Sequence, residues 1–159
     1  LAPYGTRLRA KKTWFFLDDI IVCLGTDISK GAETVIENIM LDKNSIVEIE
    51  KDFIYVKRGK NDTGVSVISS GAKTVRETRN GGWKNISSVT DGKEYSVEFL
   101  TIYKEHETDF TYEYILFPGK RVTANTEVTI VSNSSDEQSV KYKDKIYSMH
   151  WSKDEVQIL

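Results

Sequence analysis

The spacing of short apolar runs between turn residues is the feature that most constrains the fold. From residue 12 onward, runs rich in Val, Ile, Tyr, Phe and Thr alternate with clusters of Gly, Asn, Asp and Ser. Residues of the first kind suit the pleated, half-buried surface of a β-strand. Turn signals at intervals of roughly 8–12 residues are typical of a sandwich. The sequence therefore predicts an all-β fold, an antiparallel β-sandwich of about a dozen short strands with little or no helix.

The most hydrophobic run covers residues 12–25, where two apolar stretches flank Asp18 and Asp19. An acidic pair between two β-type stretches is typical of a hairpin tip. Calcium binding by the pair is the alternative, but the spacing of an EF-hand is missing. We expect a hairpin over residues 12–24 at the centre of the core, with Trp14 packed inside it.

Further strands are expected along the rest of the chain. The 34–41 run also fits one face of a helix, but its β-branched residues favour a strand. The 94–104 run alternates, which places Tyr95, Val97, Phe99 and Tyr103 on one face. Turns are expected at 58–64 and 79–83. The remaining expected strands are 45–50, 53–57, 65–68, 74–78, 110–117, 127–131, 139–142, 146–151 and 156–159.

The chain divides into three parts on these patterns. Residues 1–11 contain Pro3 and Gly5 and are expected to form a connector. Residues 12–120 form the main β-sandwich domain. A more polar seam at 119–127 precedes residues 121–159, which supply further strands of the sandwich or begin a C-terminal β-subdomain. The chain starts at Leu1 rather than Met, which indicates a processed product, a fragment or an expressed piece of a longer protein.

Composition excludes several classes of function. The formal net charge of -2 argues against a general nucleic-acid binder, whose affinity comes mostly from Lys and Arg. No apolar run approaches the roughly 20 residues that cross a bilayer, so no membrane partner is expected. The single cysteine, Cys23, cannot form an internal disulfide and is expected to be a buried small hydrophobe on a strand.

The two histidines are the remaining candidates for metal or proton chemistry. His106 and His150 lie far apart in the sequence and have no HxxxH or CxxC context. We therefore expect surface or turn histidines, with no metal site and no cofactor.

Four blocks of sequence carry a family resemblance. They are KTWFFLDD at 12–19 with its continuation to Ile28, ETVIEN at 33–38, GWKNI at 82–86 and YEYILFPG at 112–119. In this order they resemble the β-sandwich ("super-sandwich") region of polysaccharide lyase family 8, the hyaluronate, chondroitin and xanthan lyases. The similarity covers about residues 6–140. The chain departs from the family pattern at Glu107, where many relatives have Gly after the histidine.

The resemblance implies a secreted parent enzyme of several domains. Its helical toroid domain binds an acidic polysaccharide and cleaves it by β-elimination, using Asn to neutralise the uronate carboxylate and His and Tyr for proton transfer. This chain has no segment that matches the helical domain, so no catalytic residue is carried over. The resemblance implies a non-catalytic domain that supports the substrate cleft, with the helical domain and the polysaccharide as its partners.

Three residues are candidates for contact with that polysaccharide. Trp83 follows two glycines and is expected to be partly exposed, so its flat ring could stack on a sugar or a neighbouring domain. Arg7 and Arg9 belong to a small basic cluster that could face an acidic polysaccharide or only solvate an edge strand.

Two alternatives from other classes stay open. A stand-alone carbohydrate-binding module would bind glycan through Trp83 or another exposed aromatic residue. A purely structural or protein-interaction sandwich would bind no glycan and would expose a large apolar patch where its partner docks.

Overall fold

The computed structural model describes residues 5–89, 92–125, 127–151 and 155–158, the last range by its backbone alone. Within these residues the chain forms antiparallel strands and one 3-10 helix, η1 (Trp83–Asn85). None of the described segments is a helix long and apolar enough to cross a membrane. The strands are β1 (Lys11–Leu17), β2 (Ile20–Thr26), β3 (Ala32–Leu41), β4 (Ile46–Glu50), β5 (Phe53–Lys57), β6 (Val65–Ile68), β7 (Lys73–Gly82), β8 (Glu94–His106), β9 (Tyr112–Pro118), β10 (Val128–Asn133), β11 (Glu137–Tyr142), β12 (Lys145–His150) and β13 (Glu155–Ile158). The expected all-β fold is confirmed.

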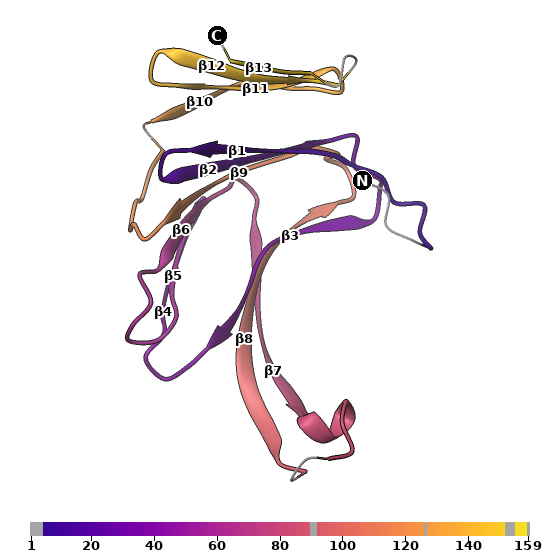
Figure 1. Cartoon of the computed structure of the whole chain (residues 1–159), viewed down its shortest axis with the longest axis vertical. Helices are drawn as coiled ribbons and strands as arrows, with labels where there is room; N and C mark the ends of the chain where they lie inside the picture. Colours follow the sequence, from indigo (N-terminus) through magenta and orange to yellow (C-terminus); the bar gives the residue numbers. More distant parts are fainter. Residues whose placement is uncertain (1–4, 90–91, 126, 152–154, 159) are drawn as a thin grey trace.

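Three sheets form the molecule, and Figure 1 shows how they are layered. The central sheet has six strands in the order β1-β2-β9-β6-β5-β4. A four-stranded sheet, β10-β11-β12-β13, covers one face of it near β1 and β2. A three-stranded sheet, β3-β8-β7, packs on the other face and extends away from the body. The strands of the four-stranded sheet all come from the chain after the 119–127 seam; whether that seam is a domain boundary stays a prediction.

The expected hairpin is confirmed as β1 and β2. Asp18 adopts a positive φ of 47°, which Asp tolerates better than most residues, and so turns the chain between Leu17 and Ile20. The Asp18 carboxylate accepts hydrogen bonds from the Lys143 ammonium (2.7 Å) and the Tyr142 hydroxyl (3.0 Å). These two donors hold its pKa below the usual value. The acidic pair is therefore a turn that is tied to the β11–β12 hairpin.

Two apolar clusters lie on the two faces of the central sheet. Because both faces are covered, β2 is buried along nearly its whole length and is continuously apolar rather than alternating. The cluster against the three-stranded sheet includes Cys23, Ile39, Ile54, Val67, Leu100, Ile102, Tyr112 and Tyr114. The cluster against the four-stranded sheet includes Phe15, Leu17, Val22, Leu24, Phe117, Val128, Val140 and Tyr142.

Trp14 was expected inside the core, and that expectation is wrong. Its side chain is 47% exposed. The reason is the strand period of two: Phe15 and Leu17 point into the cluster under the four-stranded sheet, so Trp14 and Phe16 must point the other way. β1 is the edge strand of the central sheet, and the three-stranded sheet on that face leaves Trp14 and Phe16 exposed.

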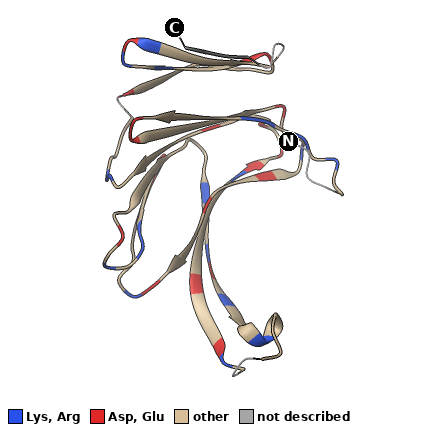
Figure 2. Ribbon diagram, viewed as in Figure 1, with Lys and Arg blue, Asp and Glu red and all other residues tan. Residues whose placement is uncertain are grey.

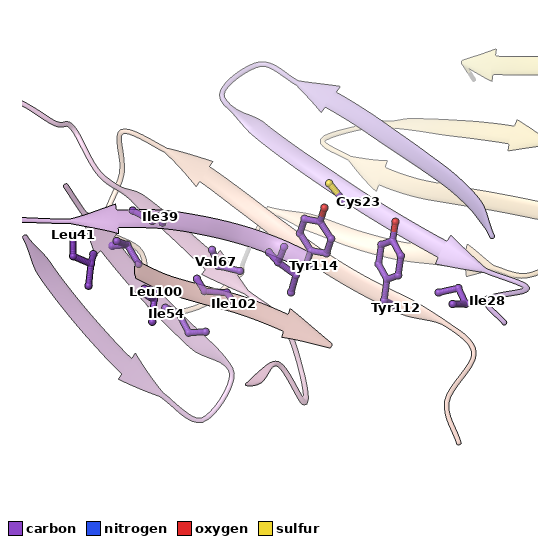
Figure 3. Packing of buried hydrophobic residues seen from close by; sticks show 12 residues of the cluster. Cys23, Ile28, Ile39, Leu41, Ile54, Val67, Leu100, Ile102, Tyr112 and Tyr114 are labelled. Carbon is purple, nitrogen blue, oxygen red and sulfur yellow. The ribbon is translucent and has the colours of Figure 1, made fainter. Parts of the chain in front are cut away.

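A close approach between β2 and β9 explains why residue 25 is a glycine. Gly25 and Tyr112 face each other in the β2–β9 register, and a Cβ on Gly25 would lie 2.1 Å from Cε1 of the Tyr112 ring. Figure 3 shows the rings of Tyr112 and Tyr114 side by side beneath β2, with Cys23 next to Tyr114. Their centroids are 5.5 Å apart in a stacked arrangement. Gly25 therefore makes room for a buried aromatic pair.

His106 was expected at the surface or in a turn, and that expectation is also wrong. It is the last residue of β8 and is completely buried. Its Nδ1 lies 2.8 Å from the carbonyl oxygen of Asp109, which can only accept, so Nδ1 carries a proton. In the neutral imidazole Nε2 then accepts from the Thr34 hydroxyl at 2.9 Å. Both ring nitrogens have partners, which makes His106 a structural link between β3 and the β8–β9 turn. His150 is half-buried on β12.

The seam at 119–127 is held by a buried hydroxyl. Ser66 on β6 is fully buried and donates a hydrogen bond to the carbonyl of Lys120 (2.9 Å). It also accepts one from the N–H of Val122 (2.9 Å). One side chain of the central sheet therefore satisfies two backbone groups of the connection between β9 and β10.

Candidate functional site

The β7–β8 hairpin forms an arm whose tip carries Trp83. The third strand, β3, pairs with β8 only as far as Glu98, whereas the β7–β8 pairing continues to Gly82 and Glu94. The outer part of the hairpin is therefore a two-stranded ribbon that projects from the body (Figure 1). The turn expected at 79–83 is wrong in its first part, because 79–82 continue β7 and the chain turns only at η1.

The tip presents apolar side chains to solvent. Trp83 is 63% exposed and Val89 is 91% exposed, and Ile86 lies exposed between them in sequence. Gly82 makes this turn possible, because a Cβ there would lie 2.4 Å from the carbonyl oxygen of Lys93 on the returning segment. The exposure expected of Trp83 is confirmed, while its contact with a ligand stays a prediction.

Charged groups of both signs accompany the apolar residues along the arm. Figure 2 shows basic and acidic residues interspersed there. The Arg79 guanidinium lies over the Phe99 ring at 4.3 Å and donates to Glu77 (2.7 Å). Nearer the tip, Lys84 lies within η1 and the Lys93 ammonium lies 5.0 Å from the Tyr95 ring centre. A ring with cations beside it is an arrangement that can contact an anionic sugar.

Arg7 and Arg9 lie elsewhere. Both are exposed in the lead-in to β1, at the side of the body in Figure 1, while the arm tip lies at the far end of the projecting hairpin. The backbone of Arg9 is fixed, since its N–H donates to Ser29 Oγ (2.8 Å) and its carbonyl accepts from Ser29 N–H (3.0 Å). Arg9 also borders a small cavity of about 80 Å³ together with Lys12 and Glu33. The structure therefore does not bring the two arginines together with Trp83.

The outward face of the three-stranded sheet presents exposed apolar side chains among charged ones. Tyr95, Val97, Phe99 and Tyr103 do share one face of β8, as expected, but it points away from the core, because the alternate residues Leu100 and Ile102 are the buried ones. Across the sheet this outer face continues through exposed side chains of β3 and β7, namely Val35, Met40 and Val75. Alternation in the sequence indicated a shared face but not which face meets the core.

A cleft opens between the central sheet and β3. Its volume is about 370 Å³, and its apolar wall includes Ile21, Ile39 and Leu116. Three charged groups, Glu37, Arg58 and Asp62, also line it. A β-bulge between Val35 and Glu37 shifts the alternation of β3, so that Glu37 follows Ile36 onto the inner side. We refer to this space as the open cleft.

The negative charge of Glu37 is only partly balanced in the open cleft. Burial raises the pKa of Glu37, an effect opposed by the positive charge of Arg58. The Arg58 side chain is held instead by Asp62, at 3.2 Å from its Nε. One local signal for this site is present in the sequence: two consecutive apolar residues, Val35 and Ile36, precede an acid and so break a strict alternation.

Neither Cys23 nor His106 is available for catalysis. Cys23 is buried, as expected, and burial raises the pKa of its thiol to about 11, so the thiolate is scarce at neutral pH. Both nitrogens of His106 are already engaged. Among the described residues, no cluster of three or more His, Cys, Asp or Glu side chains could hold a metal ion.

Comparison with known proteins identifies relatives over most of the chain. A hyaluronate lyase from Thermasporomyces composti is 26% identical, and the alignment covers 84% of this chain and 21% of the relative. A xanthan lyase from Bacillus sp. strain GL1 is 30% identical over 88% of this chain and 19% of its own length. The chain thus spans about a fifth of these relatives.

Solved structures give the same result for the fold. The chondroitin AC lyase of Streptomyces coelicolor A3, in complex with chondroitin sulphate, superposes with a TM-score of 0.79 and 25% identity. The match covers 95% of this chain and 22% of that one. The family model for polysaccharide lyase family 8, super-sandwich domain, matches residues 2–129. The chain therefore belongs to polysaccharide lyase family 8, of which it represents the super-sandwich domain.

Proposed function

We propose that this chain is a non-catalytic domain of a secreted polysaccharide lyase, which cleaves an acidic polysaccharide of the hyaluronan, chondroitin or xanthan type by β-elimination. The family membership and the names of the relatives support the reaction class. The buried thiol of Cys23 and the fully engaged His106 support a domain without catalytic groups of its own. On this proposal the chain supports the substrate cleft of the parent enzyme.

The observation that carries a role at the cleft is the arm tip. Trp83 stands at the end of a projecting hairpin with most of its ring exposed, and Lys84 follows it directly. Exposing an indole to water costs free energy that contact with a sugar ring or a neighbouring domain recovers. The lysine adds attraction for a uronate or sulfate group.

Lyase assays on two proteins test this proposal. The isolated chain should release no unsaturated oligosaccharide from hyaluronan or chondroitin sulfate, measured by ultraviolet absorbance, whereas the parent protein should. In the parent, Trp83→Ala should raise KM about tenfold, the equivalent of roughly 1.4 kcal/mol. Val131→Ala, on an exposed residue of β10, is the matched control and should leave KM unchanged. Activity in the isolated chain would refute the non-catalytic role.

We further propose that the helical catalytic domain of the same parent protein packs on the outer sheet face. The exposed apolar residues of this face include Val35, Met40 and Val75. Exposed apolar surface of this kind marks a protein interface. Ion pairs lie between the apolar residues of this face without a large excess of either charge, as Lys73 with Glu105 and Arg79 with Glu77. Such a face suits a protein partner better than a polyanion.

Met40→Glu tests the docking face. In the isolated chain the substitution is at an exposed position and should change the unfolding midpoint little. In the parent it would bury an unpaired carboxylate in the interface and should lower the thermal midpoint and the lyase activity together. Val131→Glu serves as the control and should be neutral in both proteins. An equal effect of Met40→Glu in both proteins would exclude this face as the interface.

A stand-alone carbohydrate-binding module is the second candidate, because the exposure of Trp83 favours it as well. It predicts that the isolated chain binds hyaluronan or chondroitin sulfate measurably in calorimetry. The binding should then disappear with Trp83→Ala and weaken with added salt.

A further inference from the structure

One part of the central sheet's inner face is left open. Phe16 is 75% exposed, although its cross-strand neighbour Ile21 and the next residue across, Leu116, belong to the wall of the open cleft. Directly paired residues point to the same side of a sheet. Phe16, Ile21 and Leu116 therefore form one apolar row that begins at the β1 edge and runs into the cleft.

The edge of the opposite sheet borders the same opening. Within the described residues β3 pairs with β8 and with no other strand, so its second edge is free. Glu37 and Ile39 of β3 line the cleft, which places this free edge beside the apolar row. β3 is ten residues long and contains no proline, so little blocks pairing along it.

The geometry points to an additional β-strand at this place: we propose that an extended segment of the parent polypeptide, outside these 159 residues, pairs with the free edge of β3 and covers Phe16. Its backbone would bond to the unpaired groups of β3, and alternate apolar side chains would cover the row. This inference rests on the proposed function, because it requires a longer parent protein. The relatives are longer proteins of this kind, because the chain spans only about a fifth of their length.

Charge argues for this occupant over a second copy of the chain. β3 carries Glu33 and Glu37 and has no lysine or arginine. Pairing β3 with its own copy would bring carboxylates together across the new interface without a basic partner on either strand, which is unfavourable. The half-buried Glu37 favours a segment that presents a basic or hydrogen-bond-donating side chain at its register.

Cysteine labelling at Phe16 tests the proposal. Phe16→Cys is made in the isolated chain and in the parent protein, and labelling by a maleimide is followed by mass spectrometry of the peptide. The thiol should react at least tenfold more slowly in the parent. Lys51→Cys, on the exposed β4–β5 turn, should react equally in both proteins. The unmodified chain, whose Cys23 is buried, gives the background rate.

Hydrogen exchange decides whether the occupant is a strand. The β3 amides that do not bond to β8 should exchange more slowly in the parent than in the isolated chain. Equal labelling of Phe16→Cys in a parent that still cleaves polysaccharide would overturn this inference and leave the proposed function intact. Slow labelling of Phe16→Cys without protection of the β3 amides would show that the occupant is not a β-strand. Protection of β3 that grows with the concentration of the isolated chain would assign the site to a second copy. A parent with no lyase activity would count against the proposed function instead.

Discussion

Gly25→Ala should destabilise the protein strongly although the change adds a single methyl group. Gly25 lies in a regular strand, where alanine is normally preferred by roughly 0.5–1 kcal/mol. Here the new Cβ would lie 2.1 Å from Cε1 of Tyr112, far inside van der Waals contact. Tyr112 cannot swing away, because its ring is buried and stacked on Tyr114.

The magnitude follows from this conflict. Overpacking a well-packed core costs about 1–3 kcal/mol, and the rigidity of the aromatic pair places Gly25→Ala near the upper end, at about 3 kcal/mol. Equilibrium urea unfolding of the isolated chain measures it as a lower midpoint with an unchanged slope.

A double-mutant cycle tests the cause. In a Tyr112→Leu background the ring is gone, so Gly25→Ala should cost less than about 1 kcal/mol, and the difference is the coupling energy. Gly71→Ala is no suitable control, because Gly71 has a positive φ of 70°. Ser70→Ala, at an exposed position, is better and should be neutral. An unchanged midpoint for Gly25→Ala, or the same cost in both backgrounds, would refute the reasoning.

Three other substitutions probe buried polar groups. Ser66→Ala removes both hydrogen bonds to the β9–β10 connection and should cost about 1–3 kcal/mol in urea unfolding, whereas Ser70→Ala should cost nothing. Thr34→Val removes the hydroxyl partner of His106 and should lower stability by a similar amount, about 1–3 kcal/mol, in the same measurement; a neutral result would mean that the histidine finds another partner. Glu37→Gln should stabilise the chain at pH 7, because burial raises the pKa of Glu37 and the folded protein therefore disfavours its ionised form. That gain should shrink as the pH falls through the raised pKa of the folded state and vanish below the ordinary value of 4.5, where the carboxyl is protonated in both states. A gain independent of pH would contradict the explanation.

Local sequence patterns predicted the strands well where turn chemistry was strong. The acidic pair at Asp18 and the Pro118-Gly119 stop both appear at the ends of strands. Gly81 and Gly82 misled about where the turn begins, because both continue β7, and Gly82 is required by the close approach of the returning backbone at Lys93. A glycine signals an unusual steric requirement, and the sequence does not say which one applies.

Burial was harder to predict than strand position. Trp14 and Phe15 are similar in character, yet one is exposed and the other buried, because the sheets that cover each face are assembled from distant strands. His106 looked like a surface residue because one of its two partners, Thr34, comes beside it only after β3 pairs with β8. The open cleft likewise depends on a bulge and on residues from β2, β3, β5, β6 and β9, which no local pattern connects.

The pairing of β2 with β9 has a consequence for synthesis of the chain. Cys23 pairs with Tyr114, so the most apolar strand leaves the ribosome about 90 residues before its neighbour in the central sheet. At roughly 5–20 residues per second, β2 waits for something like 5–20 s with only β1 beside it. During that interval its free edge can pair with another nascent chain. Folding yield in the cell should therefore depend on chaperones that shield this hairpin, even though the finished sandwich buries it.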